Sequence, residues 1–146
     1  MDLDYEKYEE ECEKIRTMNE TYLELFEEDL VDVSSATKKR HLSDVSLFIN
    51  DYLLYSEAKT FETGVCDIDG FLGDFFIRKC MWSTPGTIKS TACSIKKFYR
   101  CMLKHEEIQK SDYEYLCEEI KECMPQWQAD CEQFNDPDAE NPFCLF

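Results

Sequence analysis

Hydrophobic residues recur at spacings of three and four in five stretches of the chain, which is the period of an amphipathic α-helix. The first stretch runs from about residue 3 to about residue 30, and glutamates occupy its other faces. The pattern therefore predicts a long, acidic N-terminal helix with one buried stripe. That stripe comprises Tyr5, Tyr8, Cys12, Ile15, Met18, Tyr22 and Phe26.

Two helices are expected in the middle of the chain. Ser34 or Ser35 can cap the second helix, because a serine side chain accepts hydrogen bonds from free N–H groups. Its buried face comprises Leu42, Val45, Phe48, Ile49, Tyr52 and Leu53. Residues 54–64 are predicted to form a loop, after which Val65, Ile68, Phe71, Leu72, Phe75 and Phe76 face inward on a third helix. Gly70 and Gly73 are unfavourable inside a helix, so we expect a close helix contact or a kink there.

The fourth helix has a clear start signal. Ser83 or Thr84 can cap it, and Pro85 fits its first turn because proline lacks an N–H that this position leaves unpaired. The predicted buried face comprises Ile88, Ala92, Ile95, Phe98, Tyr99, Met102 and Leu103.

A fifth helix is predicted to begin at the capping box formed by Ser111 and Glu114. It buries Tyr113, Leu116, Cys117, Ile120, Met124 and Trp127. Pro125 is expected to kink or interrupt it, since proline removes a helical hydrogen bond. Regular structure is expected to end at residues 135–138.

The predicted fold is therefore all-α: a four-helix bundle core with an additional long acidic N-terminal helix. Only four glycines and four prolines occur in 146 residues, which argues against a turn-rich β fold. We divide the chain into an acidic helix over residues 1–33, a helical domain over residues 34–132, and a tail over residues 133–146. The tail ends in the apolar segment Pro142–Phe146, which we expect to dock on the body.

Charge is distributed unevenly along this chain. The formal net charge is −16, but residues 34–110 carry +3 between ends that carry −10 and −9. Five of the middle segment's cations lie on one arc of the fourth helix, nearly opposite its apolar face: Lys89, Lys96, Lys97, Arg100 and Lys104. Such a row can neutralise phosphates, and Ser90, Thr91 and Ser94 could add hydrogen bonds. The alternative is a solvated helix face that pairs with acidic neighbours.

Three further cations, Lys38, Lys39 and Arg40, lie in the first turns of the second helix. Cations there oppose the helix dipole, so their placement is locally unfavourable. An ordinary solvated face and a functional contact with an anion both remain open for them.

Signals for catalysis or metal binding are scarce. The chain lacks the common phosphate-loop, nucleophile-elbow and zinc-protease motifs, so we expect no enzyme activity and no cofactor. Nine cysteines occur without any C-x-x-C pair, and the only histidines are His41 and His105. We expect reduced, metal-free thiols and a cytoplasmic location, because the N-terminus lacks a signal-peptide pattern. No apolar run is long enough for a transmembrane helix, so no membrane contact is expected.

Five segments share a pattern of helix packing with a known family: His41–Ile49, Ile68–Lys79, Ser83–Lys89, Ser94–Met102 and Ile108–Tyr113. Over roughly residues 35–125, the chain resembles the N-terminal core-binding domain of tyrosine recombinases, the SAM-like helical domain of phage integrases. The resemblance implies a DNA-clamping helical fold with basic faces on the second and fourth helices.

The resemblance implies no recombination chemistry. In that family a separate C-terminal domain carries an Arg, a Lys, a His-x-x-Arg box and a nucleophilic Tyr. Here His41 is followed by Leu-Ser-Asp and His105 by Glu-Glu-Ile, so neither histidine begins such a box.

Two functions follow from these patterns. The first is a non-catalytic nucleic-acid-binding module of recombinase ancestry, with DNA as its partner. The second is an acidic protein-interaction or regulatory domain that engages a basic protein partner, or mimics nucleic acid, and does not bind DNA. The sequence leaves the oligomeric state open.

Overall fold

A computed structural model describes residues 2–138 of the chain. These residues form helices and connecting segments without any strand, which confirms the all-α prediction. None of the helices in this part of the chain is long and apolar enough to cross a membrane. The expected docking of Pro142–Phe146 falls outside the described residues.

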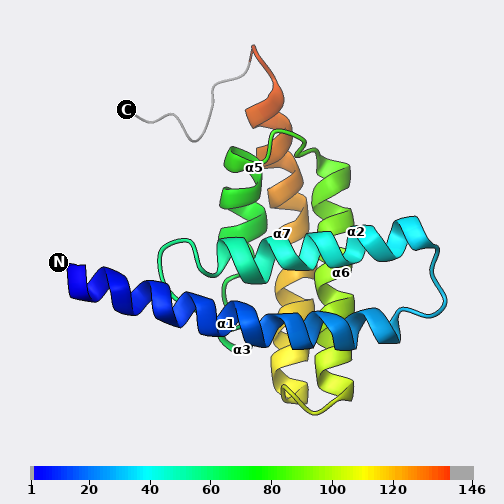
Figure 1. Cartoon of the computed structure of the whole chain (residues 1–146). Helices are drawn as coiled ribbons and strands as arrows, with labels where there is room; N and C mark the ends of the chain where they lie inside the picture. Colours follow the sequence, from blue (N-terminus) through cyan, green and yellow to red (C-terminus); the bar gives the residue numbers. More distant parts are fainter. Residues whose placement is uncertain (1, 139–146) are drawn as a thin grey trace.

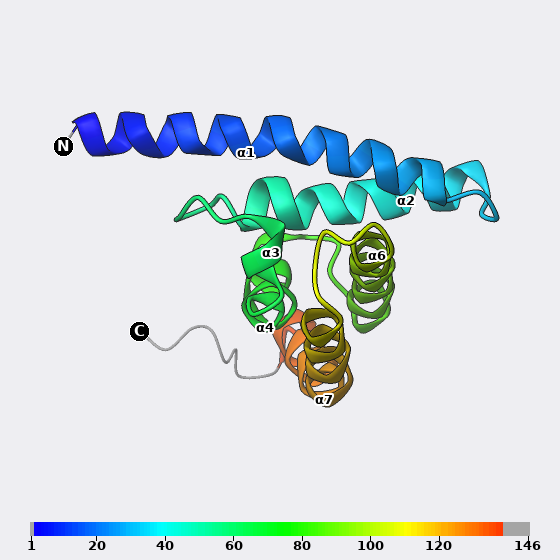
Figure 2. The ribbon, with the colours of Figure 1, turned by 90° about the horizontal axis from the view of Figure 1, so that it is seen from below.

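One layer of the structure consists of the first two long helices. Helix α1 (Asp2–Asp29) turns back into α2 (Ser35–Ser46), which continues directly as the π-helical segment η1 (Leu47–Tyr52). The two helices run antiparallel, side by side (Figures 1 and 2). The N-terminal half of α1 extends past the helices of the second layer (Figure 2).

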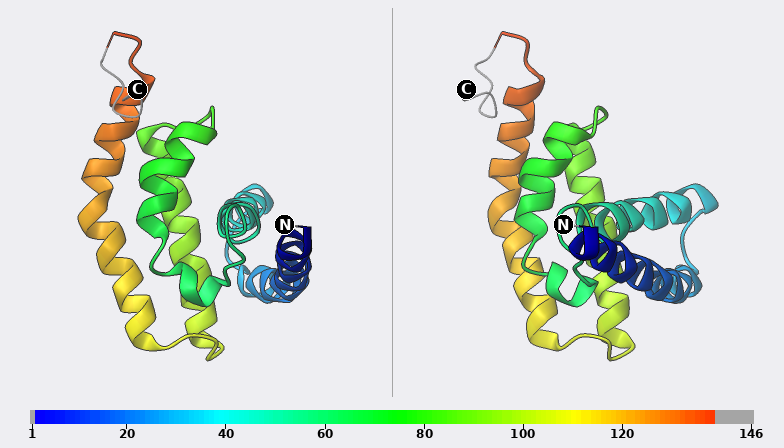
Figure 3. Two further views of the ribbon diagram at one scale, coloured as in Figure 1. Left: turned by 90° about the vertical axis from the view of Figure 1, so that its left-hand side faces the viewer. Right: turned by 60° about the vertical axis from the view of Figure 1, so that its left-hand side comes forward.

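The second layer crosses beneath the first (Figures 2 and 3). Its first member is one continuous rod made of α4 (Ile68–Gly70), the π-helical η2 (Phe71–Phe75) and α5 (Phe76–Lys79). Beside it stand α6 (Pro85–Lys104) and α7 (Lys110–Asn135), which are antiparallel and joined by a short turn. Helix α6 therefore contacts both α1 and α2 on one side and α7 on another.

A single aromatic-rich core joins the two layers. Phe26 of α1 packs edge-on against Phe98 of α6, with ring centroids 5.5 Å apart, and both are buried. Phe61 packs against the same Phe98 ring at 5.7 Å. Because burial of each such side chain stabilises the fold by about 1.5–3 kcal/mol, these contacts fix α1 on α6.

The predicted loop over residues 54–64 is wrong in part, since it contains the short helix α3 (Phe61–Gly64). Phe61 is buried, and its carbonyl accepts a hydrogen bond from the hydroxyl of Tyr99 at 2.6 Å. One apolar residue between polar ones gives no periodic signal, so the sequence does not reveal this turn of helix.

The buried stripe of α1 differs from the prediction at two positions. Tyr5 and Met18 are exposed, and Asn19 takes the buried place instead, with 2% of its surface exposed. The Asn19 amide donates to the carbonyl of Ile49 at 3.3 Å and to the side-chain oxygen of Asn50 at 2.8 Å. Both partners lie in the π-helical segment η1, so a buried asparagine here satisfies polar groups of an irregular helix.

The starts of α2 and α6 match the predictions, whereas the start of α7 does not. Ser34 caps α2 and Thr84 caps α6 through their side chains. Helix α7 begins at Lys110, where the N–H of Gln109 donates to the carboxylate of Asp112 at 3.2 Å. The predicted capping box of Ser111 and Glu114 is therefore wrong, because the helix starts before Ser111 and uses the aspartate.

The sequence predicts that Pro125 kinks or interrupts the fifth helix. Helix α7 passes through it without interruption and ends at Asn135 as expected. Burial of Trp127 beyond the proline, and its indole hydrogen bond to Asp69 at 2.7 Å, hold this part of the helix on the body. A side chain at Gly73 would come within 2.7 Å of the Trp127 ring, so this glycine permits the close contact between the two helices.

Candidate functional site

The basic residues predicted on the fourth helix form one face of α6. Lys89, Lys97, Arg100 and Lys104 are exposed, and Lys96 is half-buried. We call these five residues the α6 ridge. Cys93 is also exposed and lies four residues from both Lys89 and Lys97, so it shares their face of the helix.

Most of these cations have no acidic partner within the described residues. Among the residues that the structure describes, Lys104 is the one member of the α6 ridge that forms an ion pair, at 3.5 Å from Asp29. Within the same part of the chain, Lys38, Lys39 and Arg40 of α2 form none either. The predicted alternative, in which acidic neighbours neutralise the basic face, thus applies at one end of the ridge only.

The three cations of α2 point to different surroundings. Lys39 lines a shallow groove together with Glu20, Glu24 and Glu27 of α1. Lys38 is half-buried. Arg40 stands one helical turn before Asp44, which accepts a hydrogen bond from Ser94 of α6, so it lies on the side of α2 that faces α6. The structure therefore brings Arg40 to the α6 ridge and leaves Lys39 on the acidic side.

The predicted hydroxyl contribution to this face is wrong for two residues. Thr91 and Ser94 are buried, so neither can reach a ligand on the surface. Ser94 instead links α6 to α2: its hydroxyl donates to Asp44 at 2.7 Å and accepts from Nδ1 of His41 at 2.8 Å. We call His41, Asp44 and Ser94 the inner cluster.

Ser94 and His41 of the inner cluster are buried. Burial lowers the pKa of His41, and the nearby charges of Arg40 and Lys97 lower it further. Burial also raises the pKa of Asp44, against the opposing effects of the Ser94 hydrogen bond and Arg40. A neutral imidazole that donates to a hydroxyl is the arrangement of a structural hydrogen-bond network rather than of an activated nucleophile.

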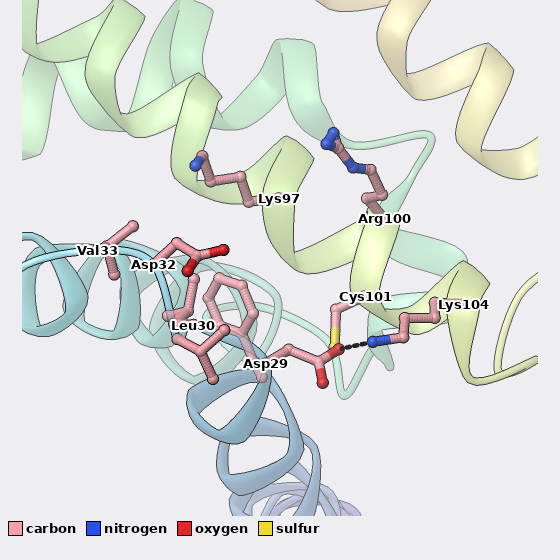
Figure 4. Close-up of a pocket in the computed structure, with 10 residues that line it drawn as sticks. Asp29, Leu30, Asp32, Val33, Lys97, Arg100, Cys101 and Lys104 are labelled. Carbon is pink, nitrogen blue, oxygen red and sulfur yellow. Dashed lines mark hydrogen bonds and ion pairs between the residues drawn. The ribbon is translucent and has the colours of Figure 1, made fainter.

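A groove with a volume of about 330 Å³ runs beside the ridge, between α6 and the end of α1. Figure 4 shows Lys97, Arg100 and Lys104 on its α6 side, and Asp29 and Asp32 facing them. The Lys104 ammonium points to Asp29, whereas Arg100 points away from it (Figure 4). The groove is therefore lined by both signs of charge, with cations on one wall and carboxylates on the other.

At the end of this groove, Asp29, Cys101 and His105 bring a carboxylate, a thiol and an imidazole together. We call these three residues the outer cluster. The Cys101 thiol donates to Oδ2 of Asp29 at 3.0 Å, and Nε2 of His105 lies 3.1 Å from the same oxygen. The thiol hydrogen bond is the main cause that lowers the pKa of Asp29, while burial and the carboxylate raise the pKa of Cys101 to about 12.

Sequence reasoning did not find the outer cluster. Cys101 and His105 stand four residues apart on a predicted helix, which places them on one face and is a usable signal. Asp29 lies 72 residues before Cys101, so only the packing of α1 against α6 brings it there.

Comparisons with known proteins identify no relative of this chain. No family model matches the chain, and searches among curated proteins and solved structures find no similar protein.

Proposed function

We propose that the protein is a non-catalytic nucleic-acid-binding module that contacts phosphates through the α6 ridge and Arg40. The observation that supports this is the set of unpaired cations. The chain has 32 acidic residues against 16 Lys and Arg, yet Lys89, Lys96, Lys97 and Arg100 form no ion pair within the described residues. A row of free cations on one helix matches the spaced negative charges of a phosphate backbone.

The contact would be electrostatic and tolerant of sequence. Lysine and arginine side chains on an exposed helix face neutralise phosphates without reading base edges. The net charge of −16 repels a polyanion at long range, but salt screens this repulsion beyond about 8–10 Å. Binding is therefore decided at contact distance, where the cations of the ridge outnumber Asp29 and Asp32.

The resemblance to the core-binding domain of tyrosine recombinases favours the same reading. That domain clamps DNA through its helices and carries no catalytic residue. We therefore also propose that the core has the SAM-like four-helix arrangement, to which α1 is added. In it, Arg40 of α2 and the α6 ridge correspond to the surface that would meet DNA.

The proposal is tested by removing the charge from the ridge. The triple variant Lys96→Ala/Lys97→Ala/Arg100→Ala should abolish binding to short duplex DNA, measured by fluorescence anisotropy, because three adjacent cations are lost. The matched control is Lys7→Ala/Lys14→Ala/Lys121→Ala, which removes the same charge from exposed, unpaired positions on α1 and α7. Equal loss in both variants would mean that net charge alone matters, and would contradict a site on α6.

The salt dependence of DNA binding is a second test of the proposed phosphate contacts. With four or five phosphate contacts, a fivefold rise in salt should weaken binding to duplex DNA by roughly three decades. If the unmodified protein ignores DNA and RNA at about 50 mM salt, where such contacts are strongest, the proposal fails.

The acidic face of α1 supports the second candidate function. Glu6, Glu9 and Glu10 are exposed and have no ion-pair partner among residues 2–138, on the part of α1 that extends past the second layer (Figure 2). Such a surface fits a basic protein partner. Changing these three residues to Gln distinguishes the two functions. If the protein binds nucleic acid, its binding of DNA should strengthen. If it binds a basic protein, its binding of a polylysine peptide should be lost.

A further inference from the structure

We propose that the outer cluster is a transition-metal site of the zinc type, held by the thiolate of Cys101, Nε2 of His105 and the carboxylate of Asp29. The ligand-bearing atoms of the three side chains all lie within 4.8 Å of one another. Thiolate, imidazole and carboxylate are the three side-chain ligands that zinc uses in proteins. Two negative ligands would balance the charge of a divalent ion, so the site would be neutral before Lys104 is counted.

The two distances from the Asp29 carboxylate to the other ligand atoms fit with a small expansion. Around a tetrahedral zinc ion, bond lengths of about 2.0–2.3 Å place neighbouring ligand atoms about 3.3–3.5 Å apart. The carboxylate oxygen of Asp29 now lies 3.0 Å from the sulfur and 3.1 Å from the imidazole nitrogen. The ion would take the place of the two hydrogens in these bonds. The thiol proton would leave to solvent, and the imidazole proton would move to Nδ1.

The backbone around the cluster also favours a cation. Asp29 is the last residue of α1, and His105 is the C-cap of α6. The negative ends of both helix dipoles therefore lie at the cluster, where they favour a cation. This contribution comes from the backbone and adds to that of the side chains, against the opposing charge of Lys104, which lies 3.5 Å from Asp29.

The three protein ligands leave a fourth coordination position. Cys101 and Asp29 line the 330 Å³ groove, so water or a small anion could reach the ion from that side (Figure 4). Asp29 and His105 are also reachable, with 22% and 31% of their side-chain surfaces exposed. A site with three protein ligands and one open position differs from a closed, four-ligand structural zinc site and leaves the ion able to bind an exogenous ligand.

Cobalt(II) is the probe of choice, because a bound thiolate gives it a charge-transfer absorption. Titration of the reduced full-length protein should produce this band with one equivalent of Co²⁺, and Zn²⁺ should displace it. Cys101→Ser should remove the band. Cys123→Ser is the matched control, because that thiol also bonds to a carboxylate on its own helix, Glu119 at 3.3 Å, but has no imidazole beside it. It should leave the band unchanged.

Two further variants keep the test decisive if Cys101→Ser fails to fold. His105→Gln changes a partly exposed side chain and should weaken Co²⁺ binding more than the about 10–100-fold that loss of an outer-shell partner costs. Lys104→Ala removes the ammonium 3.5 Å from Asp29 and should tighten binding several-fold. Absence of the band at one equivalent of Co²⁺, or its persistence in Cys101→Ser, would overturn the proposal.

Discussion

Two clusters of similar composition form where other helices meet α6, and their properties are opposite. The inner cluster joins His41, Asp44 and Ser94 where α2 crosses the middle of α6, and the outer cluster joins Asp29, Cys101 and His105 at its end. Each has one imidazole, one carboxylate and one hydroxyl or thiol. In the inner cluster the hydroxyl is the central group, and in the outer cluster the carboxylate is.

Burial and the central group explain the difference between the two clusters. Burial raises the pKa of Asp44, whereas the hydrogen bond from Cys101 lowers that of Asp29. Ser94 is fully buried, so the inner cluster has no room for a ligand and serves to hold α2 on α6. The outer cluster opens onto a groove. Residue types alone thus do not separate a structural network from a binding site, and access to solvent does.

The largest expected difference between the two clusters is in what each contributes to the free energy of unfolding. Ser94→Ala leaves His41 and Asp44 without their shared partner inside the protein, which should lower the free energy of unfolding by about 1–3 kcal/mol for each group left unsatisfied. Cys101→Ala should cost less, because Asp29 keeps His105 and Lys104 and is reached by water. Urea unfolding of both variants measures this. A larger loss for Cys101→Ala would reverse the assignment of the two clusters.

A smaller effect concerns pH. Because burial lowers the pKa of His41 below the usual value of about 6.5, the unfolded chain binds more protons than the folded one just below that pH. Stability should therefore fall as pH falls below about 6.5, by at most about 1.4 kcal/mol per pH unit. His41→Gln should flatten this dependence in thermal unfolding, and His105 is the same in both proteins. Equal slopes would show that His41 titrates normally.

The sequence predicts the long elements better than their junctions. Periodicity finds α1, α2, α6 and α7 because each buries a continuous stripe, and the caps at Ser34 and Thr84 are local chemistry. The π-helical segments and α3 have no such local signal. They depend on tertiary contacts such as the bond from Asn19 to Ile49, as does the passage of α7 through Pro125.

For the candidate site too, the sequence predicts what lies on one helix and misses what two helices form together. One helix carries the α6 ridge, so its cations can be predicted from spacing alone. Both clusters need residues from a second helix, and nothing in the local sequence tells that Asp29 meets Cys101 or that Asp44 meets Ser94. The buried positions of Thr91 and Ser94 show the limit of a helical wheel, because α2 and α1 cover a flank of α6 that the wheel leaves exposed.

Protection of Cys93 by nucleic acid is the most direct test of the α6 ridge as a phosphate-binding surface. Cys93 is exposed among the cations of the ridge, and Cys66, exposed in the turn between α3 and α4, is the control in the same molecule. Both thiols should react with a maleimide reagent in the free protein. With saturating duplex DNA at low salt, labelling of Cys93 should slow while that of Cys66 stays unchanged, as read by mass spectrometry of peptides. Unchanged labelling of Cys93, or equal protection of both, would contradict binding at the ridge.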